Sequence, residues 1–237
     1  MKISMKTTIY KSLAVLILSL GSLSFAPLSL AETPQAVPQV GNNFDAVAQP
    51  IPIDNAAKIE VMEIFWYGCI HCYQMDAPLN AWVKKLPSDV YFKRMPGLPN
   101  ASWAPMAKAF YAMETLGVAE KLHTPLFDAV HKSKTLNPTD EKAIIEWVTL
   151  QSKMDKVKVE GAFKSFTINT NLNRAAQIFR ASGATGVPSL VIDGKYITSS
   201  TMNGGNEQAL KVADYIIENV RKDKNKPAAK SEQPAKK

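Results

Sequence analysis

Two cysteines spaced C-x-x-C, Cys69 and Cys72, are the only cysteines among the 237 residues of the chain. Thiols at this spacing can close into a disulfide and open again, which suits the pair to thiol–disulfide exchange. The apolar run before them indicates a buried strand, and the residues after them have apolar side chains at helical spacing: Met75, Leu79, Trp82, Val83 and Leu86. A helix is therefore predicted to begin at or near Cys69, where unpaired backbone N–H groups and the helix dipole stabilise a thiolate.

Other uses of a C-x-x-C pair fit this chain less well. A structural zinc site commonly has four Cys or His ligands, whereas the chain has two cysteines and three scattered histidines. Attachment of a c-type haem needs a histidine directly after the second cysteine, where Tyr73 stands. A purely structural disulfide across so short a ring would constrain the unfolded chain very little. The strand–turn–helix context favours a redox-active pair.

The N-terminal residues have the features of a secretory signal peptide, which we expect to span residues 1–31. Lys2, Lys6 and Lys11 form a basic start, residues 13–20 are mainly apolar, and Ala31 ends a segment with small residues where a signal peptidase cleaves. The apolar stretch is short for a membrane span, and an uncleaved anchor is the alternative. Export into an oxidising compartment favours a pair that donates a disulfide over one that reduces it.

The formal charge of +7 comes from the two ends of the chain. The signal segment contributes +3 and residues 221–237 contribute +5, which leaves about −1 for the rest. A basic face for nucleic acid is therefore not predicted. Residues 222–237, rich in Lys, Pro and Ala, are predicted to form a disordered basic tail, and the proline-rich residues 32–43 a flexible lead-in.

Between these ends, the pattern predicts the element order β-α-β, a helical insert, and α-β-β-α. A central strand is expected at residues 58–67, and a weaker edge strand within 44–53. Asp193-Gly194, between two alternating apolar runs, indicates a hairpin. Helices are expected at residues 69–86, 103–116, 118–132, 141–154, 155–166, 171–182 and 207–221.

Residues 98–167 are predicted to form an inserted all-helical subdomain. Its helices are joined by short breaks, of which Gly117 is one. No catalytic constellation is evident in this segment. Its two histidines, His123 and His131, are interpreted as surface or hydrogen-bonded core residues rather than metal ligands.

Three sequence features together resemble one known family. The motif Cys69-Ile70-His71-Cys72, Glu63 six residues before it and Gly186-Val187-Pro188 far downstream, combined with an all-helical insert, resemble the thioredoxin-fold DsbA thiol:disulfide oxidoreductases of the bacterial periplasm. The resemblance covers residues 42–220. It implies an α/β thioredoxin fold formed by residues 44–97 and 168–221, with the insert between them. One departure is Ile70, where the best-known members have proline in the dipeptide that tunes their redox potential.

The resemblance also implies roles for individual residues. Cys69 would be the exposed nucleophile and Cys72 its buried partner. Val187–Pro188 would be a cis peptide beside the disulfide, and the backbone there would pair with an extended substrate. Glu63 would be a buried acid beneath the pair with a raised pKa, and a solvent-facing Glu63 is the alternative. His71, between the two cysteines, is expected to support the Cys69 thiolate.

The sequence thus predicts an exported enzyme, a protein disulfide oxidoreductase that donates its Cys69–Cys72 disulfide to reduced, unfolded exported proteins. The expected enzyme needs no cofactor or metal and is a monomer. The resemblance implies a quinone-linked membrane protein of the DsbB type as the partner that reoxidises it. A periplasmic disulfide reductase or isomerase remains an alternative, as does a thiolate metal-binding assembly protein.

Overall fold

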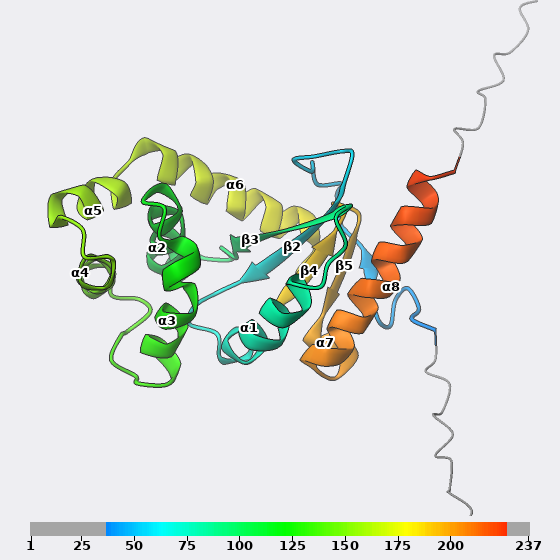
Figure 1. The fold of residues 1–237 in the computed structure, drawn as a ribbon, viewed down its shortest axis with the longest axis horizontal. Coiled ribbons are helices and arrows are strands. Elements are labelled where there is room, and N and C mark those ends of the chain that lie inside the picture. Colours follow the sequence, from blue (N-terminus) through cyan, green and yellow to red (C-terminus); the bar gives the residue numbers. More distant parts are fainter. Residues whose placement is uncertain (1–36, 227–237) are drawn as a thin grey trace, which may run out of the picture. The chain divides into compact units, whose positions relative to one another are not determined.

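The computed structural model describes residues 37–226. The expected signal peptide, residues 32–36 of the expected lead-in, and the tail from residue 227 lie outside this part of the chain. The described part is built on a five-stranded mixed sheet with the strand order β1-β5-β4-β2-β3 (Figure 1). The strands are β1 (Asp45–Ala46), β2 (Ile59–Phe65), β3 (Val90–Pro96), β4 (Ser189–Ile192) and β5 (Tyr196–Ser199).

The predicted central strand is β2, all of whose residues are buried. It pairs parallel with β3 and antiparallel with β4, so it lies inside the sheet. The predicted hairpin joins β4 to β5, and Asp193 and Gly194 have φ of 53° and 64°, the left-handed values that a tight hairpin turn requires. The edge strand β1 is only two residues long, shorter than the expected region 44–53.

Nine helical segments accompany the sheet in the described part of the chain. They are α1 (Ile70–Val83), the 3₁₀ turn η1 (Ala101–Trp103), α2 (Ala104–Thr115), α3 (Ala119–His131), α4 (Glu141–Ser152), α5 (Lys156–Phe163), α6 (Phe166–Ser182), α7 (Ser200–Asn203) and α8 (Asn206–Lys224). The order is the predicted β-α-β, helical insert and α-β-β-α, preceded by the expected edge strand, β1, and with η1 and α7 added. No helix among residues 37–226 has the length and apolar character needed to cross a membrane.

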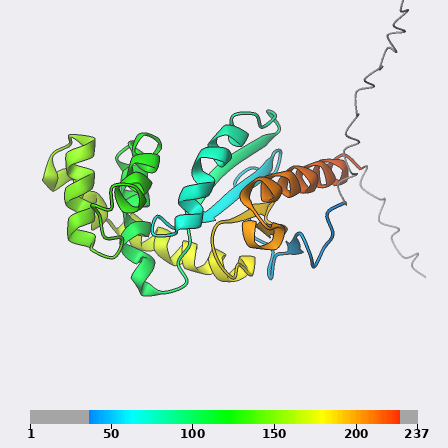
Figure 2. The same cartoon turned by 90° about the horizontal axis from the view of Figure 1, so that it is seen from below.

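Alternate residues of β2 face two different layers of helices, as the period of a strand requires. Ile59 and Val61 pack with α1 and α8 on one face, whereas Met62 and Ile64 pack with α6 on the other (Figure 2). Glu63 is in the alternation of Ile59 and Val61, so its side chain is on the α1 face. The sheet therefore delivers this carboxyl group to the helix that follows the cysteines.

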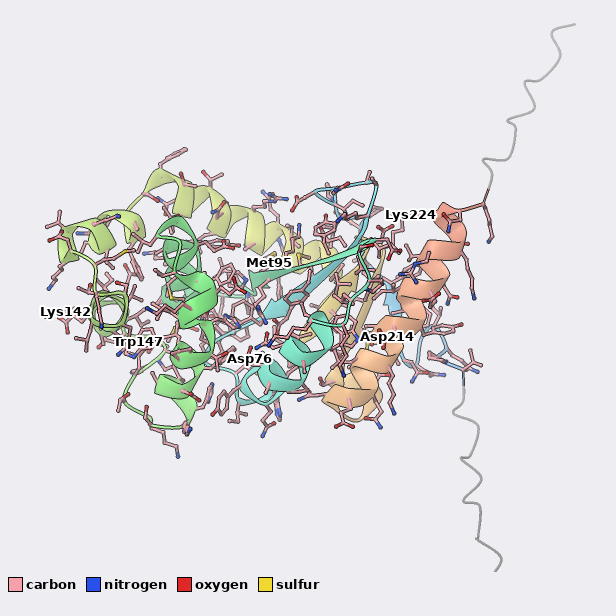
Figure 3. All side chains as sticks on the ribbon, viewed as in Figure 1. Asp76, Met95, Lys142, Trp147, Asp214 and Lys224 are labelled. Carbon is pink, nitrogen blue, oxygen red and sulfur yellow. The ribbon has the colours of Figure 1, made fainter. Side chains whose placement is uncertain are left out.

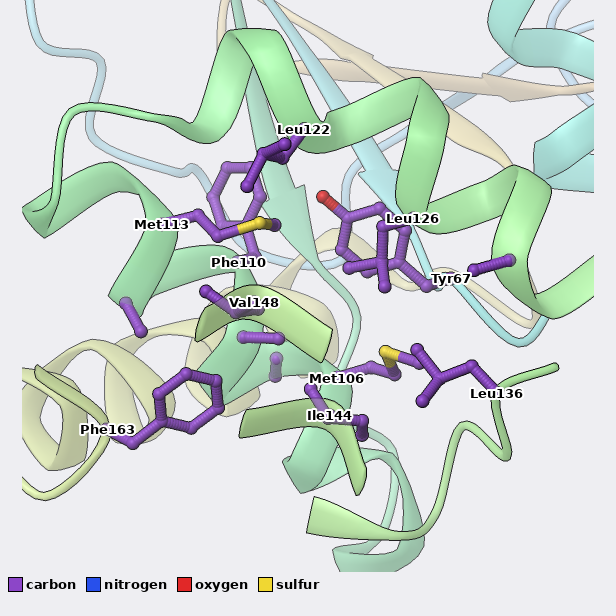
Figure 4. Close-up of a cluster of buried hydrophobic side chains, with 14 of the residues drawn as sticks. Tyr67, Met106, Phe110, Met113, Leu122, Leu126, Leu136, Ile144, Val148 and Phe163 are labelled. Carbon is purple, nitrogen blue, oxygen red and sulfur yellow. The ribbon is translucent and has the colours of Figure 1, made fainter. Parts of the chain in front are cut away.

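A third apolar cluster fills the helical insert and also reaches the end of β2. It contains Ile144, Val148 and Phe163 of α4 and α5 together with Tyr67 and Cys72 (Figure 4). The insert and the segment around the cysteines therefore share one core.

The helix α6 belongs to both parts of the fold. Ile168 and Leu172 pack in the insert cluster, whereas Ala175 and Phe179 pack against the sheet. The helix begins at Phe166, five residues earlier than predicted, and crosses the boundary expected at residue 167. Polar residues in its first turns hide the apolar period, and the Ser165 hydroxyl accepts from the backbone N–H of Ile168 at this earlier start.

Other helix ends differ from the predictions because of local backbone features. The helix α4 ends at Ser152 because Lys153 has a left-handed φ of 58°. Asp155 is the N-cap of α5 and not part of it, and α5 ends at Phe163. The short helix α7 was not predicted from the sequence; the Ser199 hydroxyl caps it by accepting from the N–H of Met202.

Candidate active site

The two cysteines lie where β2 gives way to α1. Cys69 is the N-cap of α1, with extended backbone angles (φ −91°, ψ 118°), and the helix begins at Ile70 as predicted. Cys72 is completely buried one turn into the helix, whereas Cys69 is partly exposed. Both thiols are free in this structure.

The surroundings of the two sulfur atoms make them chemically unequal. A hydrogen bond from the Cys72 thiol, with the backbone N–H groups of Cys72 and His71 and the charge of His71, lowers the pKa of Cys69 to about 6 against the opposing effect of burial. Burial raises the pKa of Cys72 well above its ordinary value, and the neighbouring Cys69 and Glu63 charges act in the same direction. The reduced pair therefore consists of an accessible thiolate and a buried thiol.

The sequence argument attributed the acidity of Cys69 to the helix N-terminus and to His71. In the structure the Cys72 thiol is the largest contributor, and the charge of His71 is a smaller one. His71 is exposed, and its Nδ1 lies 3.3 Å from Oε1 of Gln74. The C-x-x-C geometry thus lets one cysteine stabilise the thiolate of the other.

Val187 and Pro188 lie beside Cys69, although more than a hundred residues separate them in the chain. The Cys69 sulfur lies 3.4 Å from the carbonyl oxygen of Val187, to which it donates when it is protonated. The Val187–Pro188 bond is cis, as the resemblance implied, and β4 begins immediately after it at Ser189. The segment therefore presents backbone next to the reactive sulfur.

Glu63 is buried, with 2% of its surface exposed, so the solvent-facing alternative is wrong. In the sheet it stands opposite Arg94 of β3, which donates from Nε to Oε2 of Glu63 at 2.9 Å. Burial raises the pKa of Glu63 to about 7 even though the Arg94 charge lowers it. Glu63 therefore contacts Arg94 directly and acts on Cys72 through its charge.

Two charged residues near Glu63 were missed by the sequence analysis. Arg94 reaches α1, where its Nη2 donates to Oδ1 of Asn80 at 2.5 Å and lies 3.7 Å from Oδ1 of Asp76. Figure 3 shows Asp76 on α1. Asp76 is buried on α1 and accepts from the hydroxyl of Thr124 at 2.6 Å. Although burial alone would raise it, the neighbouring His123 ring, the hydrogen bond from Thr124 and the Arg94 charge lower the pKa of Asp76. Arg94 gives a weaker signal than Glu63, because it stands next to Lys93 in a strand whose middle residues are only partly buried.

Aromatic and aliphatic side chains surround the exposed sulfur. Trp66 stacks on Trp103 with ring centroids 4.3 Å apart and planes 9° apart. A Cβ atom on Gly68 would overlap the indole of Trp66, so glycine at this position lets the ring keep its place on Trp103. Ile70, which follows the nucleophile, is 44% exposed. Trp66, Cys69 and Val187 are partly buried and pack on the same apolar cluster.

The strand, the C-x-x-C at a helix start and the proline segment against the first cysteine define a dithiol protein of the thioredoxin fold. A family model described as the DSBA-like thioredoxin domain matches residues 89–216. The chain is 39% identical to the thiol:disulfide interchange protein DsbA of Azotobacter vinelandii over 184 residues, covering 77% of this chain and 85% of that protein. It is 35% identical to the DsbA of Burkholderia cepacia over 211 residues, covering 89% and 97%.

Solved structures of DsbA proteins have the same fold as this chain. The crystal structure of Pseudomonas aeruginosa DsbA superimposes with a TM-score of 0.73 at 34% identity, covering 78% of this chain and 96% of that one. The oxidoreductase DsbA of Xylella fastidiosa gives a TM-score of 0.72 at 27% identity, covering 78% and 99%. The chain belongs to the DsbA family of thioredoxin-fold thiol:disulfide interchange proteins.

This membership confirms the predicted fold class, a thioredoxin fold with a helix-rich insert, and the predicted enzyme class. The chain is a protein disulfide oxidoreductase, and its substrates are proteins that exchange thiols and disulfides with it. Among residues 37–226, no three His, Cys, Asp or Glu side chains gather where they could hold a metal ion.

Proposed function

We propose that this oxidoreductase works as an exported dithiol oxidase, which passes the Cys69–Cys72 disulfide to reduced proteins in the periplasm. The observation that carries the proposal is the inequality of the two thiols, one partly exposed with a pKa of about 6 and one buried with a raised pKa. A stabilised thiolate favours the reduced form of the enzyme and so makes the disulfide form an oxidant, a relation for which DsbA proteins themselves are the standard example.

In the first step, a substrate thiolate attacks the Cys69 sulfur of the oxidised enzyme. The S–S bond between Cys69 and Cys72 breaks, and a mixed disulfide between substrate and Cys69 forms. The electron pair leaves on the Cys72 sulfur, which takes up a proton because burial disfavours its thiolate. Attack at Cys69 follows from exposure, since Cys72 is inaccessible.

In the second step, another substrate thiolate attacks the substrate sulfur of the mixed disulfide. A disulfide forms in the substrate, and Cys69 leaves as a thiolate. The hydrogen bonds from the Cys72 thiol and from backbone N–H groups make Cys69 a good leaving group. The substrate has then lost two electrons, and the enzyme has gained them as a dithiol.

We assign supporting roles to four further residues. Val187 and Pro188 would hold an extended substrate segment beside Cys69, since the Val187 carbonyl already contacts that sulfur. Glu63, with its pKa of about 7, would assist proton movement at Cys72 through charge and water rather than by direct contact. His71 would add positive charge near the Cys69 thiolate.

The remaining parts of the proposal concern location and partners. Residues 1–31 would be the signal peptide. The basic tail expected from residue 222 starts later, because α8 continues to Lys224; residues 227–237 would form the disordered tail, with no part in catalysis. Residues 44–97 and 168–221 would form the thioredoxin-like domain, with the insert at 98–167. The enzyme would act as a monomer, and a quinone-linked membrane protein of the DsbB type would restore its disulfide.

Oxidative refolding tests the proposal. The oxidised protein, added in catalytic amount to a reduced and denatured disulfide protein in a glutathione buffer, should accelerate disulfide formation, and the Cys69→Ser variant should not. Recovery of activity from a scrambled, fully oxidised substrate would identify an isomerase instead. Net reduction of the substrate would identify a reductase, and tight binding of copper or zinc by the reduced pair with no oxidation would identify a metal-binding protein.

A further inference from the structure

The residue two positions before the nucleophile, Tyr67, is held by α3 at two separate atoms. Its hydroxyl lies 2.7 Å from Nδ1 of His123, and its backbone carbonyl accepts from Nε2 of His131 at 2.8 Å. Both histidines belong to the helical insert, whereas Tyr67 belongs to the turn between β2 and Cys69. The insert thus binds both the side chain and the main chain of the segment that carries the nucleophile.

The same face of α3 also contacts the residue directly after the cysteine pair. His123, Phe127 and His131 are four residues apart, so they form one stripe along the helix. The ring of His131 stacks on that of Tyr73, with centroids 5.3 Å apart and planes 17° apart. Phe127 lies between, with its ring 4.8 Å from Tyr67 and 6.1 Å from Tyr73. One stripe therefore contacts both flanks of the C-x-x-C segment.

A second pair of side chains fixes the same contact. The hydroxyl of Tyr73 donates to Oδ1 of Asp128 at 2.8 Å, and Asp128 is also on α3. Tyr67 is 1% exposed, and burial keeps its hydroxyl protonated by raising its pKa. These hydrogen bonds lie in or beside an apolar core, where breaking one leaves a polar group without a partner.

The orientation of His123 follows from its two neighbours. Its Nε2 lies 3.4 Å from Oδ1 of Asp76, a carboxylate on α1. Burial lowers the pKa of His123, so the ring is neutral and carries one proton. With that proton on Nε2 facing Asp76, Nδ1 accepts the hydrogen of the Tyr67 hydroxyl. The approach of Nε2 to Asp76 does not have the geometry of a hydrogen bond, so His123 binds the turn before Cys69 through Tyr67 and only lies near the helix after it.

We propose that the stripe His123, Phe127 and His131 is a brace that positions the cysteine pair, holding Cys69 against the N–H groups at the start of α1 and thereby setting the redox equilibrium of the enzyme. These are positioning residues, because they touch Tyr67 and Tyr73 and not the sulfur atoms. The inference rests on the proposed function in one respect: if the enzyme is an oxidant, a more firmly held Cys69 makes it a stronger one. It gives the helical insert a task at the redox centre in addition to covering it.

The mechanism is geometric. The Cys69 thiolate is stabilised by donors on Cys72 and on the backbone of Cys72 and His71, and each depends on where the sulfur lies. Hydrogen bonds weaken steeply with distance and misalignment. Loosening the Tyr67 carbonyl frees the turn at residues 67–69, so the sulfur spends less time within reach of those donors. The pKa of Cys69 then rises, and the reduced form loses stability.

Three variants and a control test the brace. His131→Ala removes the N–H that binds the Tyr67 carbonyl, and His131→Gln places an amide N–H in nearly the same position. Tyr67→Phe removes only the hydroxyl and keeps the ring among Phe65, His123 and Phe127. Lys132→Ala, at the exposed next position of the same helix end, is the matched control. For each full-length protein, thiolate absorbance gives the Cys69 pKa, and equilibration with glutathione gives the redox constant.

We expect His131→Ala to raise the pKa of Cys69 and to shift the glutathione equilibrium about threefold to tenfold toward the oxidised form, the effect of one net buried hydrogen bond. Tyr67→Phe should shift both in the same direction by less, because His131 still holds the carbonyl. His131→Gln should restore most of the wild-type value, and Lys132→Ala should change neither quantity.

Two outcomes would overturn the brace. The first is an unchanged pKa and redox constant in both His131→Ala and Tyr67→Phe, and the second is a failure of His131→Gln to restore what His131→Ala loses. If His131→Ala does not fold, Tyr67→Phe decides alone, since its packing is preserved. A wild-type protein that does not oxidise substrate contradicts the proposed function instead, and the pKa comparison still tests the brace.

Discussion

Cys69 and Cys72 have the same side chain and differ in reactivity because of position alone. Cys69 is at the open end of a helix, where N–H groups lack partners within the helix, and Cys72 is one turn further and inside an apolar cluster. The Cys72 thiol donates a hydrogen bond to the Cys69 sulfur and lowers the pKa of Cys69. The Cys69 charge in turn helps to raise the pKa of Cys72. A substitution of one residue between the two cysteines is therefore expected to change the difference between their pKa values without abolishing it.

We predict that His71→Val raises the pKa of Cys69 from about 6 without bringing it to the ordinary cysteine value. The charge of His71 is lost, whereas the Cys72 thiol and the backbone N–H groups remain. Thiolate absorbance as a function of pH measures the shift, with Ala77→Val, at an exposed position of the same helix, as control. A His71→Val variant that titrates like a free cysteine would show that the side chain, and not the helix start, carries the effect.

We predict that Glu63→Gln stabilises the protein above neutral pH and much less in mild acid. The folded pKa of about 7 lies above the unfolded value, so the fold disfavours the charged form. The wild type therefore loses unfolding free energy as the pH rises from the unfolded pKa to about 7, by about 2.5 kcal/mol between pH 5 and pH 8. Urea unfolding of both proteins at the two pH values measures it, with exposed Glu146→Gln as control.

In Glu63→Gln, Arg94 loses its ionic partner, and this loss reduces the gain in unfolding free energy. Arg94 keeps its hydrogen bond to Asn80 and stays near Asp76 when Glu63 becomes an amide. If Glu63→Gln and the wild type had the same pH dependence of unfolding, the carboxyl group would titrate as it does in water, against the burial seen here.

The sequence identified the site where its chemistry was local. A C-x-x-C at a helix start and a carboxylate in an apolar strand are visible in the letters, and so Cys69, Cys72 and Glu63 were found. The contact of Tyr67 with His123 and His131 was not, because it depends on the packing of α3 against the turn, which no local period specifies. The Asp76–Thr124 bond depends on the same packing.

At the scale of elements, the spacing of apolar residues predicted every helix of the described chain that is longer than four residues. The residues at which these helices begin and end depend on their capping residues. The predicted helix 155–166 is shorter in the structure. Asp155 is the N-cap of α5 and lies outside it, and Ser165 is already the N-cap of α6. A cap depends on one hydrogen bond between a side chain and the backbone, so periodicity does not reveal it. The start of α6 was missed for this reason.

We predict that Asp155→Ala lowers the free energy of unfolding by about 1 kcal/mol. Its carboxylate accepts from the N–H of Lys158 at 3.1 Å, and alanine leaves that donor without a protein partner. Asp155→Asn keeps an acceptor oxygen and should cost much less. Urea unfolding of the three proteins measures the difference; equal losses for alanine and asparagine would mean that charge, and not the cap, matters.

At the scale of the whole molecule, the insert and the redox centre are parts of one core. Cys72, Phe65 and Tyr67 lie in the same cluster as the buried residues of α2 to α5. Insertions are often thought of as added modules, but here removing the insert would expose the buried thiol. We therefore expect the insert and the cysteine pair to unfold together.

We predict that Ile144→Ala, a cavity in the insert core, lowers the unfolding free energy by about 2–5 kcal/mol and shifts every probe equally. Far-ultraviolet circular dichroism reports the helices, and labelling of Cys72 in a Cys69→Ser background reports the redox site. Leu150→Ala, which is 72% exposed on the same helix, is the control. A Cys72 labelling transition that stays in place while the helix signal moves would show that the two parts unfold separately.

The two chain connections between the insert and the sheet differ in stiffness. On one side the chain passes from β3 to η1 through residues 97–100 without regular structure, whereas on the other α6 runs without a break from one core into the other. A helix of 17 residues is a stiff rod about 25 Å long, so the insert cannot swing freely about a pair of loops. The insert side chains that pack around Tyr67 and Cys72 are therefore nearly fixed relative to the sheet. When a large partner approaches this sulfur, it is the partner that must bend, and a chain that has not yet folded bends at the least cost.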